Sequence, residues 1–373
     1  MNNTVFNNRN INTSGTLFLR ENVGQGVSIQ RFDNPKYTHI LKLLNTALGF
    51  YWLPEEVSMT IDASNFPKLS EAEQHVVISN IKSQIFLDSV MGRAPDIVFG
   101  PAISDPVLEA YVKWWSTQEM IHSKSYTHII QNSFSNPKEV LDGIMDLEDI
   151  VERSETIIAK YDNCTKLIDD YYSGNATRVE AIRAIGLALH TANVLEAVRF
   201  CTSFATSFAF AEKGILPGLG NIISFINRDE QLHYAGTTYL LKVLEDDDPD
   251  FASICNTEDF KDEVREIWRT AYYEELKWVD YLFSKGSIFG LNKAVLENYL
   301  KYIMTNRLDI MDIGTLEDLT GHKSVRDNPI RWINNWLSNK GNQPAPQETE
   351  LTNYEKGIVD LSNVDSNSFN FEL

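Results

Sequence analysis

Two Glu-x-x-His motifs constrain this chain more than any other feature of its 373 residues. Glu119 and His122 form one motif, Glu230 and His233 form the other, and both lie in stretches where apolar residues recur at helical spacing. Residues three apart lie on the same face of a helix, so each motif can offer an oxygen and a nitrogen to one ion. The alternative is that these are acids and histidines of ordinary helix contacts in a core.

Two further acids interrupt apolar helical stretches. Asp88 stands in Ile-Phe-Leu-Asp-Ser-Val-Met, and Glu196 stands in Asn-Val-Leu-Glu-Ala-Val. Burying either carboxylate without a partner is costly. Asp88 precedes Glu119 by 31 residues, and Glu196 precedes Glu230 by 34. The repeated order predicts two related helix pairs, each with a lone acid and a Glu-x-x-His motif.

Together these side chains form the ligand pattern of carboxylate-bridged dinuclear metal sites in four-helix bundles. Four carboxylates neutralise two divalent ions and leave the imidazoles neutral, so the buried site would carry no net charge. Oxygen-rich ligation favours iron or manganese over zinc. The predicted metal ligands are Asp88, Glu119, His122, Glu196, Glu230 and His233.

The periodicity predicts an all-α protein. We expect one helical domain at residues 31–339, preceded by an N-terminal arm at 1–30 that lies on the surface or is disordered, and followed by a tail at 340–373. Strand-like alternation of β-branched residues is scarce. The expected helices span residues 37–51, 70–91, 106–133, 139–160, 178–213, 221–244, 260–284, 292–313 and 329–338.

The longest expected helix, 178–213, is apolar or small nearly all round in its second half, which indicates central burial. Glu196 lies roughly 18 residues before the break at Gly214, whereas Glu230 lies roughly 10 residues after Gly220, so straight helices would place them at different depths. A bulge in the long helix or a rising loop must reconcile these depths, and we predict an irregularity near residues 200–208.

The charge excludes some function classes. Lys and Arg total 33 against 52 Asp and Glu, and the formal charge of −19 repels nucleic acids and anionic membrane surfaces. Arg183, Glu196 and Arg199 interrupt the longest apolar stretch, so no membrane span is expected. Three cysteines without a CxxC pair suit a reducing compartment. We expect a soluble, cytoplasmic protein.

Tyr126 follows His122 by four residues, so its phenol is expected on the same helix face as the ligands. Beside a metal pair that activates oxygen, such a phenol is a one-electron donor; without that context it would be an ordinary core tyrosine. Phe200, Phe204 and Ile226 stand at helical spacing from ligands and are expected either to form a dry pocket that protects a radical or to be simply core.

The last 34 residues have no amphipathic repeat and cannot bury enough apolar surface to fold alone. They carry terminal aromatic residues, Phe369 and Phe371, and end at Leu373. A spacer needs no such residues, so the tail is either a spacer or a peptide that binds a partner.

Four motifs carry a resemblance to a known family: LDSVMGR at 87–93, EMIHSKSYTH at 119–128, NVLEAVRF at 193–200 and RDEQLH at 228–233. In these motifs the chain resembles the small (beta) subunit of class I ribonucleotide reductase, from about residue 30 to 338 and again in the tail. The resemblance implies a ferritin-like bundle in which the six ligands bind two irons, and O2 reacts there to oxidise Tyr126 to a stable radical.

The resemblance also implies roles for three other residues. Trp52 matches the family's electron-transfer tryptophan, and Asp229 would form hydrogen bonds to both Trp52 and His122. Tyr354 matches the tail tyrosine that relays the radical to the large catalytic subunit. The implied protein is a homodimer that acts only with that subunit, as a ribonucleoside-diphosphate reductase that supplies deoxyribonucleotides for DNA replication.

Two other functions remain open on the sequence. A stand-alone di-metal oxidase or oxygenase would use the same ligands but would need neither Tyr354 nor a docking tail. A ferritin-like iron store is disfavoured by the chain length and by Tyr126. Both iron and manganese suit the ligand set.

Overall fold

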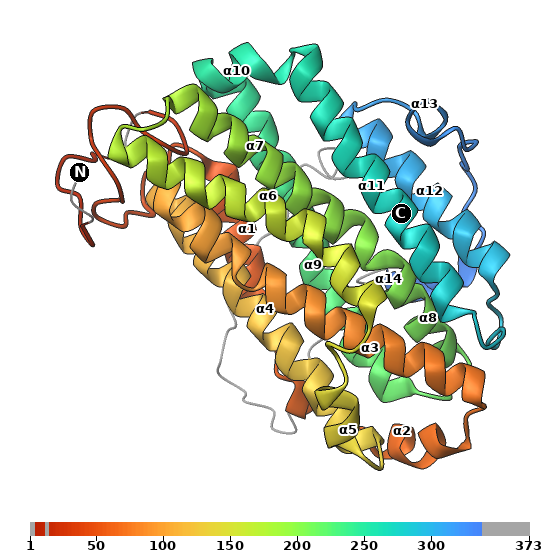
Figure 1. Ribbon diagram of the computed structural model, residues 1–373. Helices are drawn as coiled ribbons and strands as arrows, with labels where there is room; N and C mark the ends of the chain where they lie inside the picture. Colours follow the sequence, from red (N-terminus) through yellow and green to blue (C-terminus); the bar gives the residue numbers. More distant parts are fainter. Residues whose placement is uncertain (1–3, 12–14, 338–373) are drawn as a thin grey trace.

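Fourteen α-helices make up most of the part of the chain that the computed structural model describes, residues 4–11 and 15–337 (Figure 1). No β-sheet occurs among these residues, so the all-α prediction is confirmed. The helices are α1 Thr38–Gly49, α2 Thr60–Asn65, α3 Glu71–Met91, α4 Pro106–Ser133, α5 Pro137–Asp142, α6 Glu148–Ser173, α7 Arg178–Val194, α8 Cys201–Glu212, α9 Pro217–Asp247, α10 Pro249–Cys255, α11 Glu258–Leu282, α12 Lys293–Met311, α13 Leu316–Thr320 and α14 Asn334–Leu337.

Local sequence signals explain where the long helices begin. Asp105 caps α4 by accepting hydrogen bonds from the backbone nitrogens of Val107 and Leu108, both at 2.9 Å, and Pro106 occupies the first helical position. Ser70 and Glu73 form a capping box at the start of α3. These caps fix the residue at which each helix begins and thereby the position of its later side chains along the helix axis.

One predicted helix is wrong in its bounds. The structure divides the region predicted as 139–160 into α5 and α6, and α6 continues to Ser173. Helix α5 ends at Asp142, and Gly143 follows it as the C-cap residue. Gly174 ends α6 with a positive φ of 80°, a conformation that glycine adopts readily. The short helices α2, α10 and α13 and a π-helical turn at Ala94–Phe99 were not predicted, because so few residues carry little periodicity.

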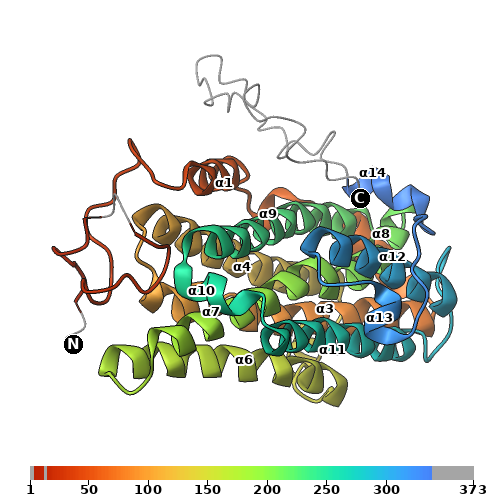
Figure 2. The ribbon, with the colours of Figure 1, turned by 90° about the horizontal axis from the view of Figure 1, so that it is seen from above.

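The central bundle is formed by α3, α4, α7 with α8, and α9. Within it α3 packs on α4, α7 and α8 both pack on α9, and α4 also contacts α9. Seen from above, α1 and α9 lie on one side of the bundle and α6 and α11 on the other (Figure 2). Every helix that carries a predicted metal ligand therefore belongs to this central group.

The long helix is irregular, but not where we predicted. A π-helical stretch at Leu195–Arg199, called the π segment below, separates α7 from α8, and Phe200 lies in the turn that follows. Residues 201–212, by contrast, form regular α-helix. The wider turn is at Glu196 itself, so the irregularity begins before 200–208 and the predicted location is corrected.

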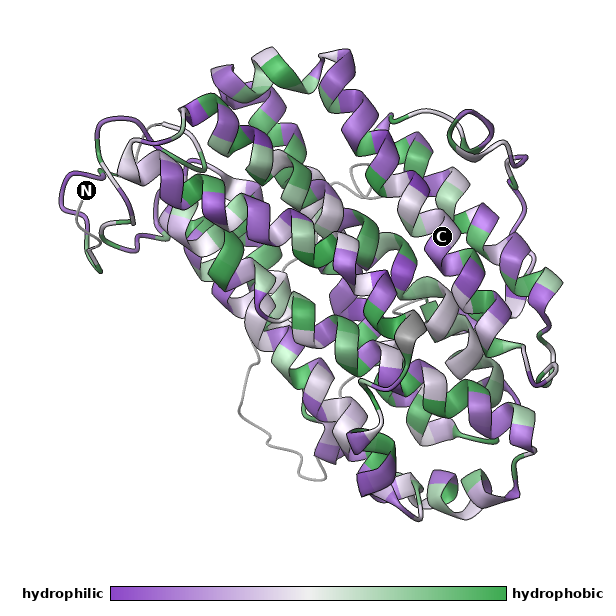
Figure 3. Ribbon diagram, in the orientation of Figure 1, coloured by the Kyte–Doolittle hydropathy of each residue, from purple (hydrophilic) through white to green (hydrophobic). Residues whose placement is uncertain are grey.

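The same helical stretch, Arg178–Glu212, is long and apolar enough in composition to cross a membrane. Its 18-residue apolar window is completely buried inside the protein, as expected of a core helix in a bundle. Outer helices such as α11 instead contain both hydrophilic and hydrophobic residues along their length (Figure 3). The expectation that the N-terminal arm lies on the surface or is disordered is wrong for Leu17, Phe18 and Leu19, which are at most 1% exposed and belong to the core.

Replacing Gly220 with alanine should lower the free energy of unfolding by about 1–3 kcal/mol, because overpacking in a tight helix contact moves the backbone. A Cβ at this position of α9 would lie 2.2 Å from the Cβ of Ala211 on α8. Gly49→Ala is the control, since nothing lies within 4 Å of a Cβ there. Urea unfolding followed by circular dichroism measures both variants, and equal stability would contradict this packing.

Candidate metal centre

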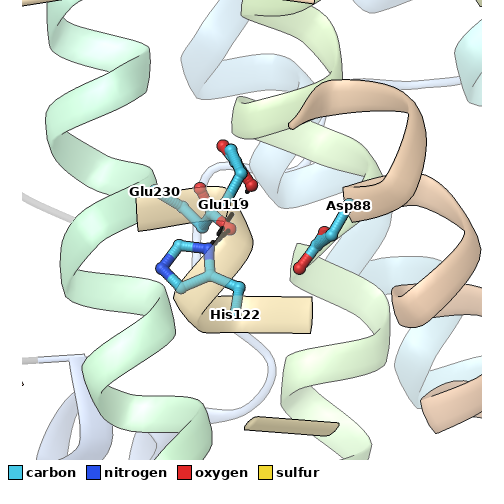
Figure 4. Close-up of side chains that lie close together, drawn as sticks. All are labelled: Asp88, Glu119, His122 and Glu230. Atoms are coloured by element: carbon cyan, nitrogen blue, oxygen red, sulfur yellow. Dashed lines mark ion pairs between the residues drawn. The ribbon is translucent and has the colours of Figure 1, made fainter. Parts of the chain in front are cut away.

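The six predicted ligands come together in the middle of the bundle. Asp88 comes from α3, Glu119 and His122 from α4, Glu196 from the π segment, and Glu230 and His233 from α9. All six are buried, with exposed fractions of at most 1%. Figure 4 shows Asp88, Glu119, His122 and Glu230 pointing toward one another from three helices.

The ligands divide into two overlapping groups whose ligand atoms lie within 4.8 Å of one another. One group, which we call the Asp88 side, contains Asp88 and His122; the other, the Glu196 side, contains Glu196 and His233. Glu119 and Glu230 belong to both groups. This is the arrangement expected of two metal positions that share two bridging carboxylates.

Both shared carboxylates turn one oxygen toward each histidine. Glu119 Oε2 lies 3.4 Å from Nδ1 of His122, and its Oε1 lies 3.1 Å from Nδ1 of His233. Glu230 Oε1 lies 3.1 Å from Nδ1 of His122, and its Oε2 lies 2.8 Å from Nδ1 of His233. Each glutamate thus spans from the Asp88 side to the Glu196 side.

The unshared carboxylates test whether metal ions fit this site. Both oxygens of Asp88 and both oxygens of Glu196 are buried and make no hydrogen bond of normal geometry to any residue that the structure describes. A buried carboxylate without a partner is destabilising. A cation on each side would supply the missing partner, so the donor set fits two divalent metal ions.

Protonation compensates the charge of the metal-free site. Burial raises the pKa of Asp88 and of Glu196 well above the usual range, and the charges of Glu119 and Glu230 raise both further. Burial alone would lower the pKa of His122 and His233, but the neighbouring carboxylates raise it. Metal binding must therefore displace protons from these ligands.

Asp229 orients the outer side of His122. Its Oδ2 lies 3.2 Å from Nε2 of His122 and accepts a hydrogen bond from Trp52 Nε1 at 2.9 Å. With the carboxylate as acceptor, Nε2 keeps its proton, and Nδ1 is the nitrogen that can bind a metal ion once its own proton is displaced. Arg228 Nη2 lies 3.5 Å from the other oxygen of Asp229. The structure thus joins Trp52, Asp229 and His122 in one chain of contacts.

Two contacts of the ligands were not predicted from the sequence. Gln118 Oε1 lies 3.2 Å from Nε2 of His233, and Trp115 Nε1 donates a hydrogen bond to Glu119 Oε1 at 2.9 Å. Trp115 precedes Glu119 by four residues on α4, so helical spacing could have identified it. Gln118 acts on a ligand of another helix, and nothing in the sequence indicates that pairing.

Tyr126 is fully buried on α4, and its hydroxyl makes no hydrogen bond of normal geometry to any described residue. Burial raises its pKa well above the usual range, and the charge of Asp88 raises it further, so the phenol stays protonated. Phe200 and Phe204 are buried and stack at 5.5 Å between ring centres, and Ile226 is also buried. Tyr354 lies outside the described residues.

Fold and site together define a class: helical bundles with a buried, carboxylate-bridged dinuclear metal site. The family model described as ribonucleotide reductase, small chain, matches residues 30–316. The chain belongs to this family, and it is a subunit of an oxidoreductase.

Relatives cover nearly the whole chain. It is 39% identical over 380 residues to the ribonucleoside-diphosphate reductase subunit beta of Haemophilus influenzae, with 98% of each chain covered. The subunit beta of reductase 1 of Salmonella typhimurium is 40% identical over 365 residues, covering 94% of this chain and 95% of that one. The ribonucleotide reductase R2 subunit from Clostridium botulinum has the same fold, with a TM-score of 0.76 at 23% identity, covering 91% of this chain and 99% of that chain.

Replacing Gln118 with leucine should weaken divalent metal binding on the Glu196 side by roughly 10- to 100-fold, because His233 loses the acceptor of its outer nitrogen. Isothermal titration of the metal-free protein with Mn²⁺ measures this. Gln231→Leu is the matched control, since Gln231 adjoins Glu230 in sequence but accepts from Arg307 instead. Equal affinities in both variants would show that Gln118 does not support the site.

Proposed function

We propose that this chain is the radical-generating small subunit of a ribonucleoside-diphosphate reductase, with two irons held by the six ligands and a stable radical on Tyr126. The observation that carries the proposal is the pair of shared carboxylates, each directed toward both histidines, with Tyr126 on the same helix as Glu119 and His122. When bound, the metal pair supplies, with O2, the oxidising power for a one-electron oxidation of Tyr126.

Tyr126 must lose a proton as well as an electron. Asp88 is the metal ligand whose charge acts most strongly on the phenol, so its carboxylate is suited to receive the hydroxyl proton. The oxidised ring must then be kept from water and reductants. Tyr126 has no exposed surface, and we assign Phe200, Phe204 and Ile226 to the apolar surroundings that protect it.

The chain of contacts from His122 through Asp229 to Trp52 is suited to electron transfer. Trp52 is 1% exposed, and its ring centre lies 6.4 Å from that of His122 and 5.2 Å from that of Phe225. Asp229 accepts from the indole and fixes its orientation. We propose that Trp52 carries electrons between the metal centre and the surface, and that Tyr354 relays the radical to the large subunit.

The relatives indicate the reaction and the partner. Their names are those of beta subunits of ribonucleoside-diphosphate reductases. We therefore propose that this chain forms a homodimer and that the homodimer binds a large subunit, which binds and reduces the ribonucleotide. A solved structure from Streptococcus sanguinis with this fold is described as dimanganese(II), with a TM-score of 0.66 at 17% identity, covering 83% of this chain and 99% of that one. Manganese is therefore the alternative to iron.

Reconstitution of the metal-free protein with Fe²⁺ and O2 should give a tyrosyl radical signal in electron paramagnetic resonance, and Tyr126→Phe should abolish that signal. Tyr161→Phe is the matched control: Tyr161 is also buried, and the charge of Glu196 acts on it, but its hydroxyl donates to Sδ of Met91 at 3.0 Å. Absence of a radical in the wild type under both iron and manganese loading would refute the proposal.

Truncation after residue 340 should abolish binding to the large subunit, whereas Tyr354→Phe should keep binding but abolish ribonucleotide reduction. Both variants should retain the Tyr126 radical, because neither change touches the described helical domain. Surface plasmon resonance and turnover assays with the large subunit measure the two effects. Full turnover by the truncated chain would disprove the role of the tail.

A further inference from the structure

A buried network of two arginines and two glutamates lies outside the metal centre and takes no part in the chemistry above. Arg153, Arg199 and Glu275 are at most 2% exposed, and Glu274 is largely buried. They come from α6, the π segment and α11. Desolvating charged groups is costly, so a buried network of this kind is expected to fix a particular arrangement of the chain.

Arg199 is the last residue of the π segment and is held at two points. Its Nη2 forms an ion pair with Oε2 of Glu274 on α11, and its Nη1 donates to the backbone oxygen of Arg153 on α6 at 3.2 Å. The planar guanidinium presents its donors in a fixed fork, so the contact with Glu274 and the contact with the Arg153 backbone together fix the orientation of the Arg199 side chain. One side chain thus joins the π segment to two flanking helices.

Glu275, the neighbour of Glu274, holds the chain beyond the π segment. Its Oε2 accepts a hydrogen bond from Thr202 Oγ1 at 2.6 Å, and its Oε1 pairs with Arg153. Arg153 in turn donates to Ser83 Oγ on α3 at 2.9 Å. Consecutive glutamates of α11 therefore fix the chain immediately before and after the turn that ends the π segment.

Glu196 lies three residues before Arg199 in the same segment and has the weakest contacts of the ligands on its side. Its oxygens make no hydrogen bond of normal geometry to described residues, and the nearest imidazole nitrogen, Nδ1 of His233, lies 3.9 Å from Oε2. Glu119 accepts from Trp115, and Glu230 lies 2.8 Å from His233. The position of the Glu196 carboxylate therefore depends on the path of its own backbone.

We propose that Arg199 and Glu274 are positioning residues that fix the path of the π segment and thereby aim Glu196 at the metal position on its side. The proposal rests on the dinuclear centre proposed above. Loss of this ion pair should act mainly on the Glu196 side, because the hydrogen bond and the ion pair of Arg199 go to α6 and α11, whereas Asp88 and His122 are carried by α3 and α4.

Titration of the metal-free full-length chain with Mn²⁺, with free Mn²⁺ read by electron paramagnetic resonance, tests the proposal. Arg199→Met should weaken one of the two binding events about tenfold or more and leave the other within about twofold. Glu196→Gln identifies which event belongs to the Glu196 side. Arg199→Lys keeps the charge but not the fork, so it should restore part of the affinity.

Glu274→Gln provides a second, milder variant in case Arg199→Met does not fold. Its amide oxygen can still accept from Arg199, so the same binding event should weaken by a smaller factor. Arg178→Met is the matched control. Arg178 also makes partly buried ion pairs, to Asp248 and Asp250 at 2.6 Å each, but at the far end of α7. Arg178→Met should leave both Mn²⁺ affinities unchanged.

The outcomes separate the two proposals. Unchanged binding in folded Arg199→Met and Glu274→Gln would overturn the positioning role, and equal weakening of both events would also overturn it by indicating general loosening. A wild-type chain that binds no pair of Mn²⁺ ions would refute the dinuclear centre itself, and the positioning role with it.

Discussion

The balance of charge inside the bundle is the constraint on which the rest of the structure depends. Four carboxylates and two imidazoles lie in the core of the bundle, each at most 1% exposed. Burial and the neighbouring carboxylates raise the pKa of Asp88 and of Glu196, which favours their protonated forms when no metal is bound. Because burial penalises every uncompensated charge, two divalent ions would balance the four carboxylates of this site.

Charge balance also requires accurate geometry, which comes from different sources on the two sides of the centre. Glu119, His122 and Tyr126 all lie on the regular helix α4. Their relative positions are therefore set by the constant rise and rotation per residue of an α-helix. On the other side, Glu196 comes from a π-helical turn, whose backbone has no such fixed repeat. Contacts to α6 and α11 are needed there, and Arg199 makes them by donating to the backbone oxygen of Arg153 and by pairing with Glu274.

The sequence predicts the centre better than its surroundings for a physical reason. A Glu-x-x-His pair such as Glu119 and His122 depends on local helical spacing alone, and a lone acid such as Asp88 is conspicuous in an apolar stretch. Gln118 supports a histidine of α9 across the bundle, and such a long-range contact leaves no periodic signal.

The long helix shows the same limit of sequence reasoning. The different depths of Glu196 and Glu230 require an irregularity, but they do not determine which residue absorbs it, so the location near 200–208 was wrong. The structure places the wider turn at Leu195–Arg199, where Arg199 reaches the buried acceptors on α6 and α11. Those acceptors are distant in sequence, and only the folded chain shows them.

A single oxygen atom links a predicted metal ligand, His122, to the buried indole of Trp52. Asp229 Oδ2 accepts from Trp52 and lies within hydrogen-bond distance of Nε2 of His122. A change in the charge or position of His122 therefore alters the acceptor strength of the atom that holds the indole.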